Sequence, residues 1–170
     1  MLDWESMSDI ALTNGATYAE KHNLRLLERL GFGIHGTVHV TQQEGKRDQS
    51  AIKALNSAEF YLRERAVYER LRAAQVTDVL GFHVPQLIQF DNNLLVIEMT
   101  IVTRPFVLDF AAAYLDSMPE FSEEIWAQWE TEKREQFGVR WTKVRDVLAA
   151  LENLGIYLTD VTPRNIAFVD

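Results

Sequence analysis

The chain has 170 residues, with 17 Lys and Arg against 25 Asp and Glu, and its formal net charge at pH 7 is −8. Hydrophobic residues make up 47% of it and charged residues 25%, which is typical of one folded domain or of two small lobes. The acidic balance disfavours a nucleic-acid partner, and the absence of cysteine excludes disulfides, thiol catalysis and thiolate metal sites. The N-terminus is unlike a signal peptide and no apolar run could span a bilayer, so we expect a cytoplasmic protein with no membrane partner.

The first hundred residues contain most of the predicted strands. Residues 1–23 are expected to be a polar, partly helical lead-in with little periodicity. Strands are predicted at 24–30, 37–41, 50–55, 86–90 and 94–99, where β-branched or apolar residues lie between turn-forming stretches. A helix is predicted at 57–73, with Ser57 as its N-cap and with Phe60, Val67 and Leu71 on its buried side. Residues 24–100 therefore form one unit in the order β-β-β-α-β-β.

Residues 101–170 are predicted to form a second, mainly helical unit, with the boundary just before Pro105. Helices are predicted at 106–115, 125–135 and 141–154, and Gly155 is expected to end the last of them. Short strands at 156–158 and 166–169 enclose a polar loop. The acid-rich stretch 116–135 is expected to be a solvated surface.

Three glycines, Gly31, Gly33 and Gly36, lie between the first two predicted strands and are followed by Val38. Glycines at this spacing let the backbone approach phosphate groups. A dinucleotide-binding fold would need a helix directly after them, so the strand-like stretch 37–41 disfavours a nicotinamide-dependent oxidoreductase. Two interpretations stay open: a glycine-rich hairpin that covers nucleotide phosphates, and a surface hairpin without a ligand.

A lysine and a glutamate are predicted to meet inside the first unit. Lys53 lies in the apolar strand segment Ala51-Ile52-Lys53, and lysine is rarely buried without a partner. On a helical wheel Glu64 falls within the apolar side of helix 57–73, where it needs a cation. We therefore predict an ion pair between Lys53 and Glu64. The alternatives are a solvent-facing lysine on an edge strand and a glutamate at the margin of the apolar side.

The polar loop near the C-terminus contains the sequence Asp160-Val161-Thr162-Pro163-Arg164-Asn165. An aspartate in such a loop can orient a hydroxyl group or accept its proton. An asparagine five residues later can ligate Mg²⁺ through its side-chain oxygen. The alternative is an ordinary turn, because the loop is rich in turn-forming residues.

The order of these features along the chain resembles that of the protein-kinase-like fold. The resemblance covers residues 24–170 and implies an α+β architecture: an antiparallel five-stranded N-lobe sheet with one helix, followed by a partial, mainly helical C-lobe. It also implies ATP and Mg²⁺ as cofactors. The implied reaction transfers the ATP γ-phosphoryl group to a hydroxyl of a protein Ser/Thr or of a small molecule.

The resemblance further implies a role for particular residues. Asp160 would be the catalytic aspartate, Lys53 would bind the α- and β-phosphates, and Glu64 would steady Lys53. Asn165 would help to hold Mg²⁺. The residues expected to contact the nucleotide are Gly31, Gly33, Gly36, Val38, Ala51, Lys53, Ile97 as gatekeeper, and Glu98 and Thr100 through their backbones, which would face the adenine.

The chain departs from the family pattern after Asn165, where no Asp-Phe-Gly follows. Asp109-Phe110-Ala111 precedes the catalytic loop, and Asp170 resembles the turn of a hairpin. The principal metal ligand is therefore expected to be missing. We expect a weak or inactive enzyme, and the alternative is a pseudokinase or a kinase-derived interaction module.

Two further expectations concern partners and substrate. Because little of a large lobe follows, the apolar side of helix 141–154 is expected to be uncovered, which predicts self-association or a protein partner. Thr162 stands where many serine/threonine kinases carry a lysine, and Arg164 precedes Asn165 as an arginine does in tyrosine kinases. The phosphoryl acceptor therefore stays open between proteins and small molecules.

Overall fold

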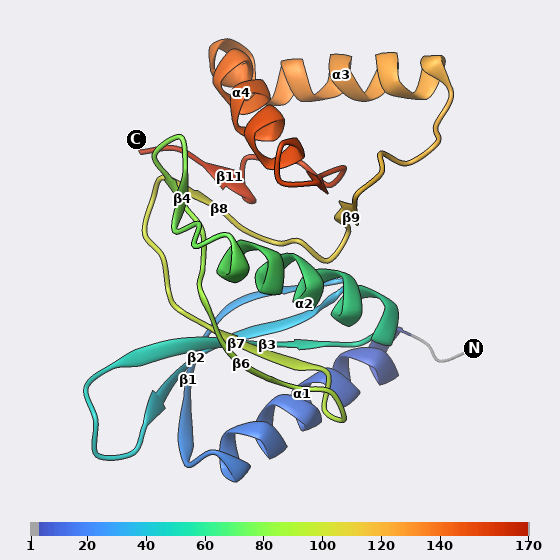
Figure 1. Ribbon diagram of the computed structural model, residues 1–170. Coiled ribbons are helices and arrows are strands. Elements are labelled where there is room, and N and C mark those ends of the chain that lie inside the picture. The colour runs from blue at the N-terminus through green and yellow to red at the C-terminus, as the bar shows by residue number, and fades with distance from the viewer. Residues whose placement is uncertain (1–3, 170) are drawn as a thin grey trace.

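The computed structural model describes residues 4–169 and has an α+β architecture (Figure 1). The N-terminal part contains a sheet between α-helices α1 and α2, and the C-terminal part, drawn above it, contains the α-helices α3 and α4. The elements of the N-terminal part are α1 (Trp4–Lys21), β1 (Leu24–Gly33), β2 (Gly36–Gln43), β3 (Gln49–Leu55), α2 (Ala58–Ala73), β4 (Asp78–Val79), β5 (Phe82–His83), β6 (Leu87–Asp91) and β7 (Val96–Met99). Those of the C-terminal part are β8 (Phe106–Val107), β9 (Tyr114–Leu115), α3 (Glu123–Phe137), the 3₁₀ turn η1 (Gly138–Arg140), α4 (Trp141–Glu152), β10 (Ile156–Tyr157) and β11 (Ile166–Ala167).

Five strands form one antiparallel sheet in the order β1-β2-β3-β7-β6, which confirms the predicted five-stranded sheet. The central strand β3 is buried from Ser50 to Leu55, so both faces of the sheet are covered there. Val38 on β2 and Ile97 on β7 lie directly opposite Lys53. Since opposite residues of antiparallel strands point to the same side, these three side chains share one face.

Helix α1 packs on the other face of this sheet, where the sequence predicted only a partly helical lead-in. The buried residues of this contact are Ala11, Tyr18, Ile52, Ala54 and Val96. The Tyr18 hydroxyl also donates a hydrogen bond to the buried Glu98 carboxylate, at 2.8 Å. Small residues and one tyrosine make this contact, so the helix lacks the strong apolar period that would have predicted it. Residues 1–3 of the expected lead-in lie outside the described residues.

Helix α2 packs on the face of the sheet that carries Lys53 and confirms the helix predicted at 57–73. Glu64, Val67 and Leu71 are buried along it, as the helical wheel predicts. Phe60 is half-buried and lies against the His35 ring, with ring centroids 4.2 Å apart. The helix therefore places a carboxylate on the same side of the sheet as Lys53.

The helix predicted at 106–115 is wrong, because this segment forms β8 and β9 with a loop between them. β8 pairs antiparallel with β11, and β9 pairs antiparallel with β10. Asp109 has a φ of 64°, a left-handed conformation that interrupts a helix. Pairing with strands far along the chain thus overrides the local apolar pattern.

Helices α3 and α4 confirm the helices predicted at 125–135 and 141–154, and Gly155, with a φ of 73°, follows the end of α4 as predicted. The expectation of an uncovered apolar side on α4 is wrong. Val144, Val147 and Leu151 have no exposed surface and belong to the main core. The neighbouring α3, β4 and β10 pack against α4. The structure therefore gives no support to self-association through this side.

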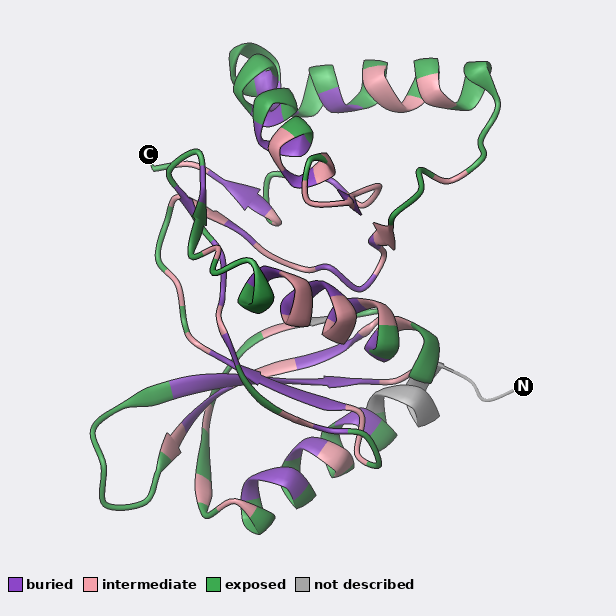
Figure 2. Cartoon of the chain, viewed as in Figure 1, coloured by how far each residue is buried: buried purple, intermediate pink, exposed green. Residues whose placement is uncertain are grey.

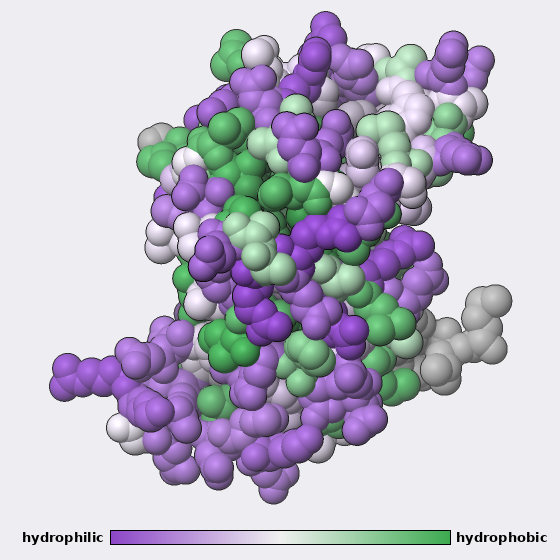
Figure 3. Space-filling view, viewed as in Figure 1, coloured by the Kyte–Doolittle hydropathy of each residue, from purple (hydrophilic) through white to green (hydrophobic). Residues whose placement is uncertain are grey.

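Buried residues line the contacts between these elements. Figure 2 shows them along β3 and on one side each of α2 and α4. On the face drawn in Figure 3, hydrophobic residues gather toward the middle and hydrophilic residues predominate at the two ends. Among residues 4–169, no helix is both long and apolar enough to cross a membrane.

Candidate functional site

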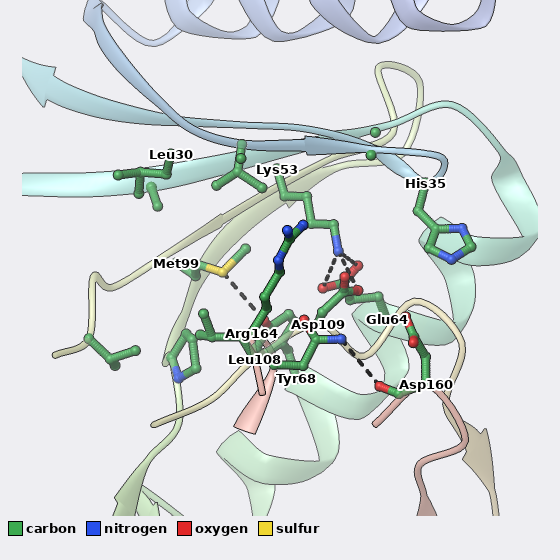
Figure 4. Close-up of a pocket in the computed structure, with 18 of the residues that line it drawn as sticks. Leu30, His35, Lys53, Glu64, Tyr68, Met99, Leu108, Asp109, Asp160 and Arg164 are labelled. Carbon is green, nitrogen blue, oxygen red and sulfur yellow. Dashed lines mark hydrogen bonds and ion pairs between the residues drawn. The ribbon is translucent and has the colours of Figure 1, made fainter. Parts of the chain in front are cut away.

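A cavity of about 670 Å³ lies between the inner face of the sheet and the C-terminal part of the chain (Figure 4). Its volume falls within the range of about 300–1,000 Å³ that is usual for ligand sites. The predicted site residues that line it are Gly31, Gly33, Gly36, Val38, Ala51, Lys53, Glu64, Thr100, Asp160 and Asn165. The structure therefore brings together residues from both units of the chain.

The glycines lie in the β1–β2 hairpin, whose tip is held against the end of β3. Gly33 and Gly36 are opposite partners at the end of the ladder. Gly36 has a positive φ of 149°, and a Cβ atom there would collide with the backbone oxygen of Ala54, so only glycine fits. Asn56 Nδ2 donates to the Ile34 backbone oxygen at 2.6 Å and fixes the tip. A strand follows the glycines, so the helix that a dinucleotide-binding loop requires is not in place.

Lys53 is buried between two carboxylates. Its Nζ atom lies 2.8 Å from Glu64 Oε2 and 2.8 Å from Asp109 Oδ1. The Glu64 side chain has no exposed surface, whereas that of Asp109 is 31% exposed. Burial lowers the pKa of Lys53, but the two carboxylates outweigh burial and raise that pKa above its ordinary value. The predicted Lys53–Glu64 pair is confirmed, and Asp109 is a second partner that the sequence did not predict.

Asp109 reaches the cavity because its segment is held against the loop that precedes β11. The Leu108 backbone N–H donates to the Asn165 backbone oxygen at 2.7 Å. The Thr159 hydroxyl donates to the Ala112 backbone oxygen at 3.3 Å. The strand pairs β8–β11 and β9–β10 flank these two hydrogen bonds. The strand pairs therefore hold loops 108–113 and 158–165 face to face. The triplet Asp-Phe-Ala is visible in the sequence, but only this pairing brings it to the cavity.

Phe110 fixes the same segment beneath α2. Its ring has no exposed surface and meets the Tyr68 ring edge-on, with centroids 5.4 Å apart. Its backbone also hydrogen-bonds to the Glu64 carboxylate. Burial raises the pKa of Asp109, but Lys53 outweighs burial and holds that pKa below its ordinary value. Asp109 is therefore ionised at neutral pH.

The loop before β11 contributes Asp160 and Asn165 to the lining of the cavity, and Figure 4 shows Asp160 on the side opposite the sheet. Asn165 Nδ2 donates to the Asp160 backbone oxygen at 3.2 Å, and the Asn165 backbone N–H donates to the Thr162 backbone oxygen at 3.0 Å. Trp129 on α3 donates its indole N–H to the Thr159 backbone oxygen at 2.9 Å. These bonds fix the loop and leave the Asn165 amide oxygen to accept a hydrogen bond or to coordinate a cation.

At the end of β7, Met99 and Thr100 line the cavity, whereas Ile97 and Glu98 do not. Ile97 is fully buried in the main core. The Glu98 side chain points to the opposite face of the sheet, beneath α1. The Thr100 backbone N–H donates to the Gln86 oxygen at 2.9 Å, so it already has a partner. Ile97 lies on the same face of the sheet as Met99, but packing in the main core covers it completely, so Met99 lines the cavity in its place.

Residues 4–169 contain no preformed cluster of three or more His, Asp or Glu side chains that could hold a metal ion. The cavity does contain carboxylate oxygens and the Asn165 amide oxygen, and oxygen donors of this kind suit Mg²⁺. Mg²⁺ usually takes one or two protein ligands and completes its shell with waters and phosphate oxygens. The donor set therefore fits a metal ion that binds together with a phosphorylated ligand.

Comparisons with protein-family models, with curated proteins and with solved structures found no match to this chain. Function is therefore inferred from the fold and from the residues of the cavity. They define an α+β protein with a charged cleft between a five-stranded antiparallel sheet and a C-terminal part that contains two α-helices and short paired strands.

Proposed function

We propose that the protein is a nucleotide-binding phosphotransferase of protein-kinase-like architecture, which transfers the γ-phosphoryl group of ATP to a hydroxyl group. The observation that carries the proposal is the buried Lys53–Glu64 ion pair, which faces Asp160 and Asn165 across one cavity. A glycine-rich hairpin lines the same cavity. A ligand-free surface hairpin and an isolated turn would not account for this convergence of separate segments.

In this proposal, Lys53 and the hairpin bind the phosphate groups. Glu64 holds the Lys53 ammonium in a fixed position, so its charge needs little reorganisation when a ligand binds. The backbone N–H groups of a glycine-rich hairpin can approach phosphate oxygens closely. Bound Mg²⁺ would neutralise charge on the β- and γ-phosphates. Asn165 would contribute its side-chain oxygen to that ion.

In this proposal, Asp160 acts on the acceptor hydroxyl. Its carboxylate accepts the hydroxyl proton while the acceptor oxygen bonds to the γ-phosphorus. The bond between that phosphorus and the β–γ bridging oxygen breaks, and the bridging oxygen leaves with ADP. Asp160 then releases the proton to solvent, since the residue is only half-buried.

A nucleotide-binding module without catalysis is the second candidate function. Regulated protein kinases carry an arginine at the position that corresponds to Thr159. Many serine/threonine kinases carry a lysine at the position that corresponds to Thr162. Here the two hydroxyls serve the loop itself: Thr159 bonds to Ala112, and Thr162 accepts the Asn165 backbone N–H at 3.3 Å. The lysine would neutralise charge on the transferred phosphoryl group, and its absence favours binding without rapid turnover.

Turnover of ATP with Mg²⁺ separates the two candidates. Asp160→Asn should retain ATP binding and lose turnover by at least about 10²-fold, the usual contribution of a general base. The exposed Asp48 gives a matched control, and Asp48→Asn should behave as the wild type. Binding without turnover in the wild type would favour the second candidate. No binding of ATP by the folded wild type would contradict both.

A further inference from the structure

We infer that Asp109 is the carboxylate ligand of the nucleotide-bound Mg²⁺, supplied by a segment that precedes the catalytic loop. The inference rests on the nucleotide site proposed above. In the protein kinases that the chain resembles, this ligand follows the catalytic loop, whereas Asp109 precedes it. The structure places Asp109 in the cavity by a different path of the chain, which supplies the ligand from upstream.

The strand pairing accounts for this placement. β8 leads directly into Leu108 and Asp109, while Asn165 leads directly into β11. Because β8 and β11 are antiparallel, the end of one lies beside the start of the other. The 2.7 Å hydrogen bond from the Leu108 N–H to the Asn165 oxygen joins the two segments at that point. The carboxylate and the amide oxygen therefore enter the cavity from neighbouring backbones.

The Asp109 carboxylate has one oxygen engaged and one open. Oδ1 accepts from Lys53 at 2.8 Å and from the Ala111 backbone N–H at 3.4 Å. Within the described part of the chain, no hydrogen bond reaches Oδ2. Lys53 thus fixes the orientation of the carboxylate while its second oxygen can coordinate a cation, as an ordered ligand must.

The charge of the cavity calls for a cation. Its described lining carries the three carboxylates of Glu64, Asp109 and Asp160 against the two cations of Lys53 and Arg164. Lys53 is already paired with two of those carboxylates. A polyphosphate would meet net repulsion in such a cleft. A divalent ion held by Asp109 and Asn165 would turn that repulsion into attraction.

The backbone conformation at Asp109 decides which test variant is appropriate. Its φ of 64° is a left-handed conformation that aspartate and asparagine adopt more readily than most residues. Asparagine tolerates this conformation as well as aspartate does. Asp109→Asn therefore removes the negative charge and keeps the backbone, which makes it the appropriate test variant.

The experiment measures Mn²⁺ binding by electron paramagnetic resonance in the presence of saturating ADP. Asp109→Asn should weaken Mn²⁺ binding by at least about tenfold, as the loss of a ligand does. Its affinity for adenosine, which needs no metal, should stay within about twofold of the wild type. Asp48→Asn should match the wild type in both measurements. Asp109→Glu, which keeps the charge but moves the carboxylate, should also weaken Mn²⁺ binding.

Three results bear on the inference in different ways. Equal Mn²⁺ affinity in Asp109→Asn and Asp48→Asn would overturn it. ADP binding without Mn²⁺ binding by the wild type would overturn it too, yet leave the nucleotide site standing. No binding of ADP by the wild type would refute the proposed function itself. Thermal unfolding without ligand shows whether each variant is folded. If Asp109→Asn does not fold, Asp109→Glu still tests the inference.

Discussion

Lys53 Nζ lies 2.8 Å from Asp109 Oδ1, although 56 residues separate them in the sequence. The same ammonium contacts Glu64 on α2, so β3, α2 and the segment after β8 meet at one cation. This contact joins the sheet to the C-terminal part of the chain. The stability of the fold and the geometry of the cleft therefore depend on the same residue.

Lys53→Met should destabilise the protein strongly. The substitution leaves the Glu64 carboxylate buried without a cation, and breaking a buried pair in this way costs about 3–5 kcal/mol. Urea unfolding measures the loss of free energy. The double variant Lys53→Met/Glu64→Gln removes the orphaned charge as well, so it should recover part of the loss. A loss below about 1 kcal/mol in the single variant would contradict the dependence of the fold on this buried pair.

The Lys53–Asp109 contact predicts how stability changes in acid. The pKa of Asp109 in the folded protein lies below its ordinary value of about 4. A carboxylate of this kind stabilises the fold at pH values above its ordinary pKa, and the stabilisation is lost as pH falls through the folded pKa. Free energies of unfolding between pH 6 and 2 should therefore fall less steeply below about pH 4 in Asp109→Asn. Parallel curves for the two proteins would show that the contact is not formed in solution.

Tyr18→Phe tests how α1 is attached to the sheet. Glu98 is buried and accepts hydrogen bonds from Tyr18, Ser50 and Gln89 at 2.7–2.8 Å. Burial and the nearby Glu98 raise the pKa of Tyr18, so its hydroxyl stays protonated as the donor. Loss of this donor should cost about 1–3 kcal/mol in unfolding experiments. Tyr157, whose hydroxyl makes no hydrogen bond to the described residues, provides the control: Tyr157→Phe should change stability by less than about 0.5 kcal/mol.

Arg164 predicts a further effect on nucleotide binding. Its side chain extends from the loop before β11 into the cavity (Figure 4). A guanidinium group can bind phosphate oxygens through two parallel hydrogen bonds. Arg164→Ala should therefore weaken ADP binding by about tenfold, or about 1.4 kcal/mol, in calorimetry. Arg164→Lys should lie between that variant and the wild type. Equal binding by Arg164→Ala and by Arg72→Ala, a change at an exposed position on α2, would refute this role.

The sequence predicts the part of the site that depends on local patterns. Lys53 and Glu64 could be paired because a strand pattern and a helical wheel each turned one charge toward an apolar interior. Gly36 could be placed in a hairpin because strand-like residues follow it. The loop from Asp160 to Asn165 was recognisable by its spacing and by its polar residues between apolar runs.

The rest of the site depends on contacts that local patterns do not encode. Asp109 enters the cavity only because β8 pairs with β11, far along the chain. Residues 106–115 look helical from their composition, and tertiary pairing overrides that preference. Ile97 faces the same side of the sheet as Lys53, but tertiary packing in the main core, which its own sequence does not reveal, keeps it out of the cavity. The packing of α1 was missed because alanine and tyrosine, without an apolar period, make the contact.

Thermal unfolding of the wild type with ATP, with and without Mg²⁺, tests the central claim most directly. A ligand at 100 times its Kd adds about 2.7 kcal/mol of stability. For a chain of this size, that should raise Tm by about 5–10 °C. We predict a rise of this order with Mg²⁺ and a smaller one without it, because the cavity is acidic. A cooperative transition whose midpoint does not move with either addition would contradict a nucleotide site in this cleft.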